Sequence, residues 1–222
     1  MMELGVIDLA LKFNEQVIFK HANVSFESGK ISFVMAPNGT GKTTLIKLLT
    51  GLLKVDKGVI ANSVQNFDCF VLFDKLSLYG NLTGLENIKL FTEFKIHQRK
   101  IEKIALSYFS KKVLNKKVKN YSLGEGKKLS LIIWELLKPQ ITIMDEVTNG
   151  LDYETLKTLR EKLNDSKMGK IVLLTGHQFE FYEEMIDSLY VIKNNQIVEI
   201  INWGERRLAD VYEENFATRA VL

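Results

Sequence analysis

The chain of 222 residues is 46% hydrophobic and 26% charged, which gives it enough apolar side chains for one substantial core and excludes a disordered chain. Its 30 basic and 27 acidic residues leave a net charge of only +3, far below the imbalance of a dedicated nucleic-acid binder, so we expect no nucleic acid among its partners. No window reaches the roughly 18 to 20 apolar residues that span a bilayer, and the amino terminus has no basic or sustained apolar segment, so we expect a soluble, cytosolic protein.

The strands can be predicted from two different patterns. Three amino-terminal runs, 6–13, 17–19 and 24–26, alternate in a way that predicts strands of a partly exposed antiparallel sheet. Three later runs are continuously apolar, which is typical of parallel strands covered by helices on both faces. They are "ISFVMA" from Ile31, "ITIM" from Ile141 and "IVLLT" from Ile171. The single cysteine, Cys69, excludes an internal disulfide and, in the apolar run "FDCFVLF", is predicted to be a small buried residue.

Helical patterns separate these strands. The stretch "GKTTLIKLLTGLL" from Gly41 is predicted to be a helix, and residues 85–137 are mainly helical. In the latter, apolar side chains recur at helical spacing at Leu129, Ile132, Ile133, Leu136 and Leu137. Asp152 is predicted to be the N-cap of a helix with Leu156, Leu159 and Leu163 on one face. The layout predicts an α/β core with a small amino-terminal β layer and a helical subdomain inserted in the middle.

The first chemical motif is "APNGTGKTTL", residues 36–45, between a predicted strand and a predicted helix. It matches the P-loop pattern G-x-x-x-x-G-K-[ST] from the second glycine onward. The backbone N–H groups of such a loop point inward, and the amino-terminal end of the following helix carries a partial positive charge, so the loop suits a polyphosphate. Lys42 can reach the β- and γ-phosphates, and the Thr43 hydroxyl can ligate Mg²⁺. Ala36 replaces the first glycine; if that position needs a positive φ, alanine costs about 1 kcal/mol and distorts the loop. The expected nucleotide-binding residues are Asn38, Gly39, Thr40, Gly41, Lys42, Thr43 and Thr44.

The second motif is "ITIMDEVTNGLD", where an apolar strand ends in two adjacent carboxylates. We expect Asp145 to face the metal ion and Glu146 to polarise a water molecule aimed at the γ-phosphate. Paired acids at a strand end also occur by chance, and a glycine-rich turn need not bind a ligand. Together, however, the two motifs indicate a nucleotide-hydrolysing site.

With these motifs in order, nearly the whole chain resembles the ATP-binding cassette (ABC) family. The family's signature LSGGQ corresponds to "YSLGEGKK" from Tyr121, and the resemblance implies that Ser122, Gly124 and Glu125 contact a nucleotide bound to the opposite subunit. "VTNGLD" keeps all but the proline of the family's P-T-N-G-L-D, ending in Asp152, which is expected to help join the two halves. By the same resemblance, His177 corresponds to the switch histidine and Phe13 to the aromatic residue that stacks on adenine.

Several positions depart from the family pattern. Asp74 stands where the Q-loop glutamine belongs; it could still ligate Mg²⁺, but it brings a negative charge toward the phosphates. Leu123 replaces the first signature glycine, Glu125 the glutamine, and Lys128 the usual arginine. The variant "YSLG" is similar to cassettes of peptide-antibiotic export and immunity transporters.

The resemblance implies a P-loop NTPase core with a mostly parallel sheet, forming one ABC ATP-binding domain over 1–222 with a helical subdomain at about 80–138. It implies an ATPase that uses ATP and Mg²⁺, pairs with a second cassette as a homo- or heterodimer, and powers a separate integral membrane permease. The permease is expected to dock near residues 74–86, which places the chain at the inner face of the cell membrane. The open alternatives are a non-transport ABC ATPase and a regulatory cassette with weak hydrolysis; a P-loop kinase would need neither "YSLG" nor the late histidine.

Two segments carry no assigned chemistry. The run "KKVLNKKVKN", 111–120, has five lysines but lacks the interleaved aromatic residues of a base-stacking surface, so we interpret it as a solvated basic face. The carboxyl-terminal stretch from Trp203 has the pattern of an amphipathic helix, whose apolar face could pack on the domain or on a partner.

Overall fold

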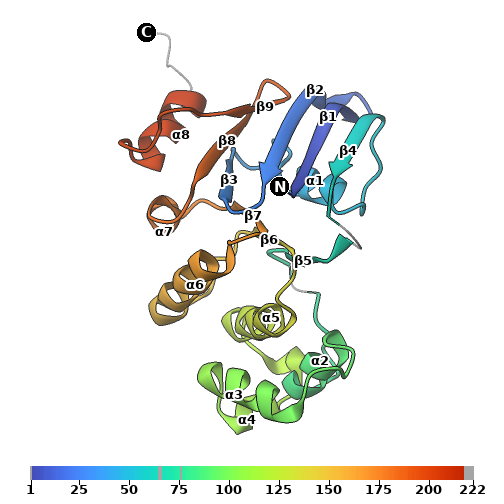
Figure 1. Cartoon of the computed structure of the whole chain (residues 1–222), viewed down its shortest axis with the longest axis vertical. Helices are drawn as coiled ribbons and strands as arrows, with labels where there is room; N and C mark the ends of the chain where they lie inside the picture. The colour runs from blue at the N-terminus through green and yellow to red at the C-terminus, as the bar shows by residue number, and fades with distance from the viewer. Residues whose placement is uncertain (1, 65–66, 76, 218–222) are drawn as a thin grey trace.

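The computed structural model describes residues 2–64, 67–75 and 77–217 (Figure 1). An antiparallel sheet of order β2-β1-β4 contains β1 (Glu3–Phe13), β2 (Gln16–Glu27) and β4 (Lys57–Asn62). The predicted amino-terminal sheet is confirmed, but the predicted runs 17–19 and 24–26 belong to one strand, and β4 was not predicted. The reason is local: Asp8 and His21 have positive φ and the β1–β2 register shifts between Val6 and Leu9, so the alternation breaks while the strand continues.

The second sheet has the order β5-β6-β7-β3-β8-β9 and forms the centre of the domain. Its predicted strands are β3 (Ile31–Met35), β6 (Ile141–Asp145) and β7 (Ile171–Thr175), in which every residue is buried. They pair in parallel with each other and with β5 (Cys69–Leu72) and β8 (Ser188–Lys193); only β9 (Gln196–Glu199) is antiparallel to its neighbour. Cys69 lies in β5, half-buried rather than buried, and burial raises the pKa of its thiol to about 12.

Both faces of this sheet are covered, which explains its continuously apolar strands. On one face, Val34 and Leu173 pack with α1 (Lys42–Leu49) and the antiparallel sheet. On the other, Phe33 and Leu174 pack with α6 (Tyr153–Ser166), α7 (Phe179–Glu183) and α8 (Leu208–Phe216). Successive strand side chains point to opposite faces, so a strand covered on both sides is mostly apolar along its whole length instead of alternating with polar residues.

Three of the helices can be compared with the helical patterns predicted from the sequence. The helix α1 ends at Leu49, earlier than the predicted stretch to residue 53. The helix α6 begins as predicted, because the Asp152 side chain accepts a hydrogen bond from the Thr155 N–H at 2.9 Å. In α8, Leu208 and Val211 are fully buried in the core, so the apolar face of this helix packs on its own domain; residues 218–222 lie outside the described part of the chain.

The helical subdomain contains α2 (Gly84–Phe91), α3 (Gln98–Tyr108), α4 (Lys111–Leu114), η2 (Val118–Asn120) and α5 (Leu123–Leu137), and occupies the lower end of Figure 1. Of the predicted apolar stripe on α5, only Leu137 is exposed, at 41%. The opposite row of α5, Leu131 and Trp134, packs against the central sheet, so α5 joins the subdomain to the core. None of the helices in the described ranges is long and apolar enough to cross a membrane.

The predicted basic face at 111–120 forms α4 and η2. Lys111, Lys112, Lys117 and Lys119 are exposed, whereas Lys116 is half-buried. Four of the five lysines are therefore solvated, as expected from the sequence.

Candidate functional site

The predicted phosphate loop connects the carboxyl end of β3 to the start of α1. Gly39 and Gly41 have φ angles of 80° and 117°, a backbone conformation that residues with a side chain rarely adopt. A Cβ on Gly41 would lie 3.0 Å from side-chain atoms of both Ile18 and Phe19, so this position needs glycine for space as well. Ala36 is 1% exposed and is not one of the described residues with positive φ, so the distortion expected from its missing glycine does not arise.

Lys42 is folded along this loop and is 7% exposed. Its Nζ donates hydrogen bonds to the carbonyl oxygens of Ala36, at 2.6 Å, and Pro37, at 3.3 Å. Burial lowers the pKa of Lys42, while the carboxylates of Glu146 and Asp145 act in the opposite direction. The loop therefore holds a cationic group at its centre, close to two acids.

Asp145, at the end of β6, joins three elements of the site and is 4% exposed. Its Oδ2 accepts a hydrogen bond from the Thr43 hydroxyl at 2.8 Å, and its Oδ1 accepts one from Thr175 at the end of β7. A hydroxyl and a carboxylate are the hard oxygen donors that Mg²⁺ prefers, so these two residues fit the ion. Within the described ranges, no three His, Cys, Asp or Glu side chains are placed to hold a metal ion.

Glu146 and His177 approach each other beside the loop. Glu146 Oε1 lies 3.4 Å from His177 Nε2, which is also 2.9 Å from Asn38 Oδ1 and 3.2 Å from Lys42 Nζ. Burial raises the pKa of the Glu146 carboxyl, His177 and Lys42 lower it, and Asp145 raises it further. A carboxylate with a raised pKa beside a histidine can accept a proton from water, the chemistry that phosphate-ester hydrolysis requires.

These residues surround one cavity of about 270 Å³. It is lined by Asn38, Gly39, Gly41, Lys42, Thr43, Thr44, Asp74, Asp145 and Glu146. Most of the predicted phosphate-site residues therefore lie together, although they come from three separate parts of the chain, 38–44, Asp74 and 145–146.

Asp74 lies in this cavity, but its Oδ1 accepts hydrogen bonds from Lys127 Nζ at 3.1 Å and from Asn149 Nδ2 at 3.3 Å. Sequence reasoning missed Lys127. The available signal was its position in α5, where Lys127, Leu131 and Trp134 are spaced as one helical row that faces the sheet.

The predicted signature residues lie elsewhere. Ser122 is the N-cap of α5 and forms a capping box with Glu125, whose carboxylate also accepts a hydrogen bond from Lys116 at 2.9 Å. A Cβ on Gly124 would lie 2.3 Å from the Gly150 carbonyl oxygen, so the signature packs directly on the "TNGLD" loop. None of the three predicted signature residues lines the phosphate-loop cavity. Asp152 caps α6 and pairs with Lys128.

Phe13 ends β1 and is 46% exposed, opposite Gln16 across the hairpin. Gln16 and the loop residues Gly39 and Thr40 line a second cavity of about 360 Å³, together with Phe216 of α8. Phe13 itself is not part of that lining, although its cross-strand partner Gln16 is. Sequence reasoning also missed α8 at the site, where Phe216 lines this cavity.

Aromatic residues of α7 and α8 pack around His177. The ring of Tyr212 lies 6.4 Å from that of His177, and the ring of Phe179 lies 6.5 Å from it. Tyr212 also contacts Phe216, at 5.0 Å between ring centroids. The helix α8 therefore lies beside the histidine through Tyr212.

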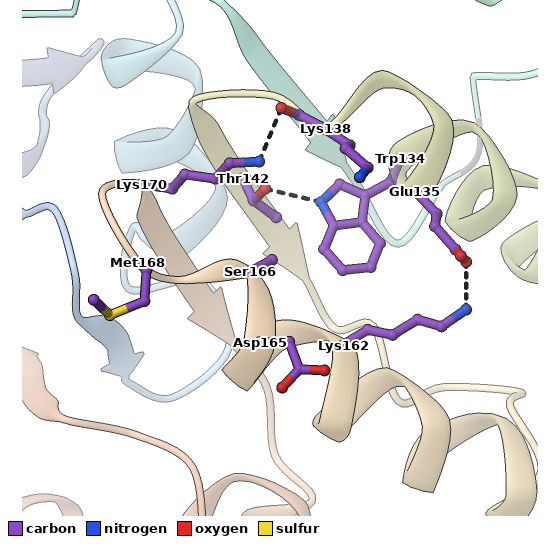
Figure 2. A pocket seen from close by; sticks show the side chains of 9 residues that line it. All are labelled: Trp134, Glu135, Lys138, Thr142, Lys162, Asp165, Ser166, Met168 and Lys170. Atoms are coloured by element: carbon purple, nitrogen blue, oxygen red, sulfur yellow. Dashed lines mark hydrogen bonds and ion pairs between the residues drawn. The ribbon is translucent and has the colours of Figure 1, made fainter.

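The largest of the cavities described, about 470 Å³, lies away from these residues (Figure 2). It is found at the amino-terminal ends of β6 and β7, beside Lys138, Thr142 and Lys170, whereas Asp145 ends β6. Several of its polar groups are paired, because Trp134 donates to Thr142 Oγ1 at 2.9 Å and Lys162 pairs with Glu135 (Figure 2). We therefore place the functional site at the phosphate loop.

Comparison with known proteins gives a consistent result. The family described as "ABC transporter" matches residues 19–149. The chain is 30% identical to an uncharacterized ABC transporter ATP-binding protein, YdbJ, of Bacillus subtilis (strain 168), over 87% of this chain and 67% of that protein. It is 27% identical to the lantibiotic transport ATP-binding protein SrtF of Streptococcus pyogenes, over 88% and 89%, and 27% identical to the bacitracin transport ATP-binding protein BcrA of Bacillus licheniformis, over 87% and 68%. A solved structure described as the ATP binding subunit of an ABC transporter superposes with a TM-score of 0.85 at 22% identity, over 95% of this chain and 98% of that one.

Proposed function

Since the chain belongs to the ABC transporter family, as an ATP-binding subunit with ATPase activity, we propose that it powers movement of a substrate through a separate membrane permease. The observation that supports this most strongly is the convergence of Lys42, Thr43, Asp145 and Glu146 on one cavity, with His177 Nε2 3.4 Å from the Glu146 carboxylate. A nucleotide-binding site without hydrolysis would not need a partly buried carboxylate beside a histidine.

In this proposal each residue acts on a different part of ATP. The loop N–H groups and Lys42 bind the β- and γ-phosphates. Glu146 orients a water molecule and accepts its proton as the water oxygen attacks the γ-phosphorus and the β–γ bond breaks, while His177 donates a hydrogen bond to the γ-phosphate. Thr43 and Asp145 would hold Mg²⁺, which neutralises phosphate charge when bound.

The site is completed by a second cassette. Ser122 and Gly124 lie outside the cavity formed by the phosphate loop, so one chain supplies two separated halves of a site. We propose that two cassettes, identical or different, close face to face around ATP, so that the signature of one chain meets the phosphate loop of the other. Glu125 and Asp152 would lie at this junction, and Phe13 would stack on adenine near the second cavity.

The transported substrate is proposed to be a peptide antibiotic. The supporting observation is that two relatives are named for lantibiotic and bacitracin transport. The permease would dock near residues 74–86, where Tyr79 is 55% exposed, and would hold the cassette at the cytoplasmic face of the membrane. Co-purification with a membrane protein tests this docking against a non-transport role.

The test of the proposed function is ATP hydrolysis by the purified chain beside its Glu146→Gln variant, with the oligomeric state followed in Mg-ATP. We expect turnover in the wild type, and ATP binding with stable dimers but no turnover in the variant. Glu161→Gln, an exposed change on α6, should behave as wild type. Near-normal hydrolysis by Glu146→Gln would remove this residue from its proposed role.

A further inference from the structure

Lys127 is a fully buried lysine with two partners at the phosphate site. Its side chain is 0% exposed, and its Nζ donates to Asp74 Oδ1 at 3.1 Å and to the Glu146 carbonyl oxygen at 2.6 Å. A buried ammonium group is costly unless it is paired and hydrogen-bonded, and here one partner is a carboxylate and the other a main-chain oxygen. Lys127 therefore connects two elements of the site that are far apart in sequence.

The first partner introduces a charge that the site must tolerate. Three carboxylates line the cavity, from Asp74, Asp145 and Glu146, whereas Lys42 is the only lysine among the described residues of its lining. Asp74 contributes to the raised pKa of Glu146, so its charge is felt at the catalytic carboxylate. Without a partner, this charge would repel a triphosphate, and solvent would screen only part of the repulsion, since the Asp74 side chain is 54% exposed.

The second partner has an unusual backbone conformation. Glu146 has a φ of 53°, a left-handed backbone conformation that a non-glycine residue keeps only when its surroundings fix it. Its carbonyl oxygen accepts hydrogen bonds from Lys127 and from the Asn149 N–H at 3.3 Å. Lys127 is therefore one of the groups that hold the main chain of Glu146 in the orientation that aims its side chain at His177.

We propose that Lys127 is a positioning residue of the ATP site, which neutralises Asp74 and anchors the main chain of Glu146. The inference rests on the proposed function, since it concerns the same site. In this inference the Asp74 carboxylate forms an ion pair with Lys127, whereas the sequence suggested that Asp74 ligates Mg²⁺. Because Lys127 belongs to α5, whose N-cap is the signature residue Ser122, the same contact connects this helix to the main chain of Glu146.

The test is a double-substitution cycle read as the Kd for Mg-ATP and as kcat. Lys127→Gln removes the charge but keeps an amide donor, so we expect the Kd to rise about tenfold as Asp74 becomes uncompensated. Adding Asp74→Asn makes the pair neutral and should return the Kd to within about threefold of the wild type. A second double variant combines Lys127→Met with Asp74→Asn. Its Kd should also return to near the wild-type value, because neither residue is charged. Its kcat should stay about tenfold below that of the wild type, because methionine cannot donate a hydrogen bond to the Glu146 carbonyl oxygen.

A matched control comes from another lysine that forms an ion pair with α5, Lys162 of α6. Lys162 pairs with Glu135 of α5 at the cavity in Figure 2, away from the phosphate loop, and its side chain is 28% exposed. Lys162→Gln should leave the Kd and kcat at wild-type values. Thermal unfolding of each variant shows whether a loss of binding follows from a loss of folded protein.

The outcomes separate this inference from the proposed function. A wild-type chain that fails to bind Mg-ATP overturns the proposed function itself, and one that binds without turnover overturns hydrolysis by a pair of identical cassettes. If the wild type binds, an unchanged Kd in Lys127→Gln, or a double variant no tighter than Lys127→Gln alone, overturns the charge pairing. If Asp74→Asn combined with Lys127→Met has the same kcat as Asp74→Asn combined with Lys127→Gln, the anchoring of Glu146 is overturned.

Discussion

The N-cap of α6 offers a prediction whose size can be worked out from two contacts. The Asp152 carboxylate accepts hydrogen bonds from Thr155, from its N–H at 2.9 Å and its hydroxyl at 2.8 Å, and it pairs with Lys128 of α5. These contacts, the Lys128 pair first, lower the pKa of Asp152 to about 2. The same carboxylate therefore caps one helix and ties it to another.

The two contributions can be separated by two substitutions. Asp152→Ala removes both the cap and the pair and should lower the free energy of unfolding by about 1–2 kcal/mol. Asp152→Asn keeps a good cap and loses only the charge, which should cost about 0.5–1 kcal/mol. Converted in full, a pKa falling from 3.8 to about 2 would be worth about 2.4 kcal/mol. Because the side chain is 56% exposed, solvent screening reduces this to about 1 kcal/mol or less.

The pH dependence follows from the sign of the shift. A carboxyl group whose pKa is lower in the folded state contributes stability above its ordinary pKa near 4, and this contribution is lost as the pH falls from about 4 to about 2. Urea unfolding followed by circular dichroism at pH 7 and pH 3 should show the gap between wild type and Asp152→Asn shrinking at pH 3. Glu161→Gln on the same helix is the control. Equal losses in the Asn and Ala variants, or a gap that does not change with pH, would refute this reasoning.

Three further predictions test other parts of the structure. Lys42→Ala should weaken Mg-ATP binding about ten- to a hundredfold in a calorimetric titration, because it removes a charged donor to the phosphates; unchanged binding would undo the phosphate assignment. Gly124→Ala should lower the free energy of unfolding by about 1–3 kcal/mol, since its Cβ would lie 2.3 Å from the Gly150 oxygen, and an unchanged urea midpoint would contradict that packing. Leu163→Ala should cost about 2–5 kcal/mol by the same measurement, because its side chain is fully buried between α6 and the sheet.

The central strands and the motifs at their ends could be predicted because each depends on residues that are close together in the sequence. A strand covered on both faces is buried at every position and mostly apolar, as 31–35, 141–145 and 171–175 are. The residues that follow each strand, in the P-loop, the acid pair and the region of His177, then meet at one edge of the sheet. The α6 cap was also predictable, because Asp152 contacts a residue only three positions away.

Other features could not be predicted because they depend on distant contacts or broken patterns. The strand β2 continues through His21, whose positive φ interrupts the alternation. The antiparallel edge strand β9 has only four residues, of which Ile197 alone is buried. The pairing of Lys127 with Asp74 joins residues 53 positions apart, and nothing in either neighbourhood indicates the other.

The charged departures from the family pattern have a common feature in the structure. Asp74 faces Lys127, Glu125 faces Lys116, and Lys128 faces Asp152, so each has an opposite charge beside it. Considered singly in the sequence, Asp74 and Glu125 suggested weakened hydrolysis; considered as pairs, they add no net charge near the phosphates. Glu146 and His177 are also retained, so this charge compensation favours a hydrolysing cassette over a regulatory one. It also predicts that neutralising one member of a pair lowers stability or ATP binding more than neutralising both members.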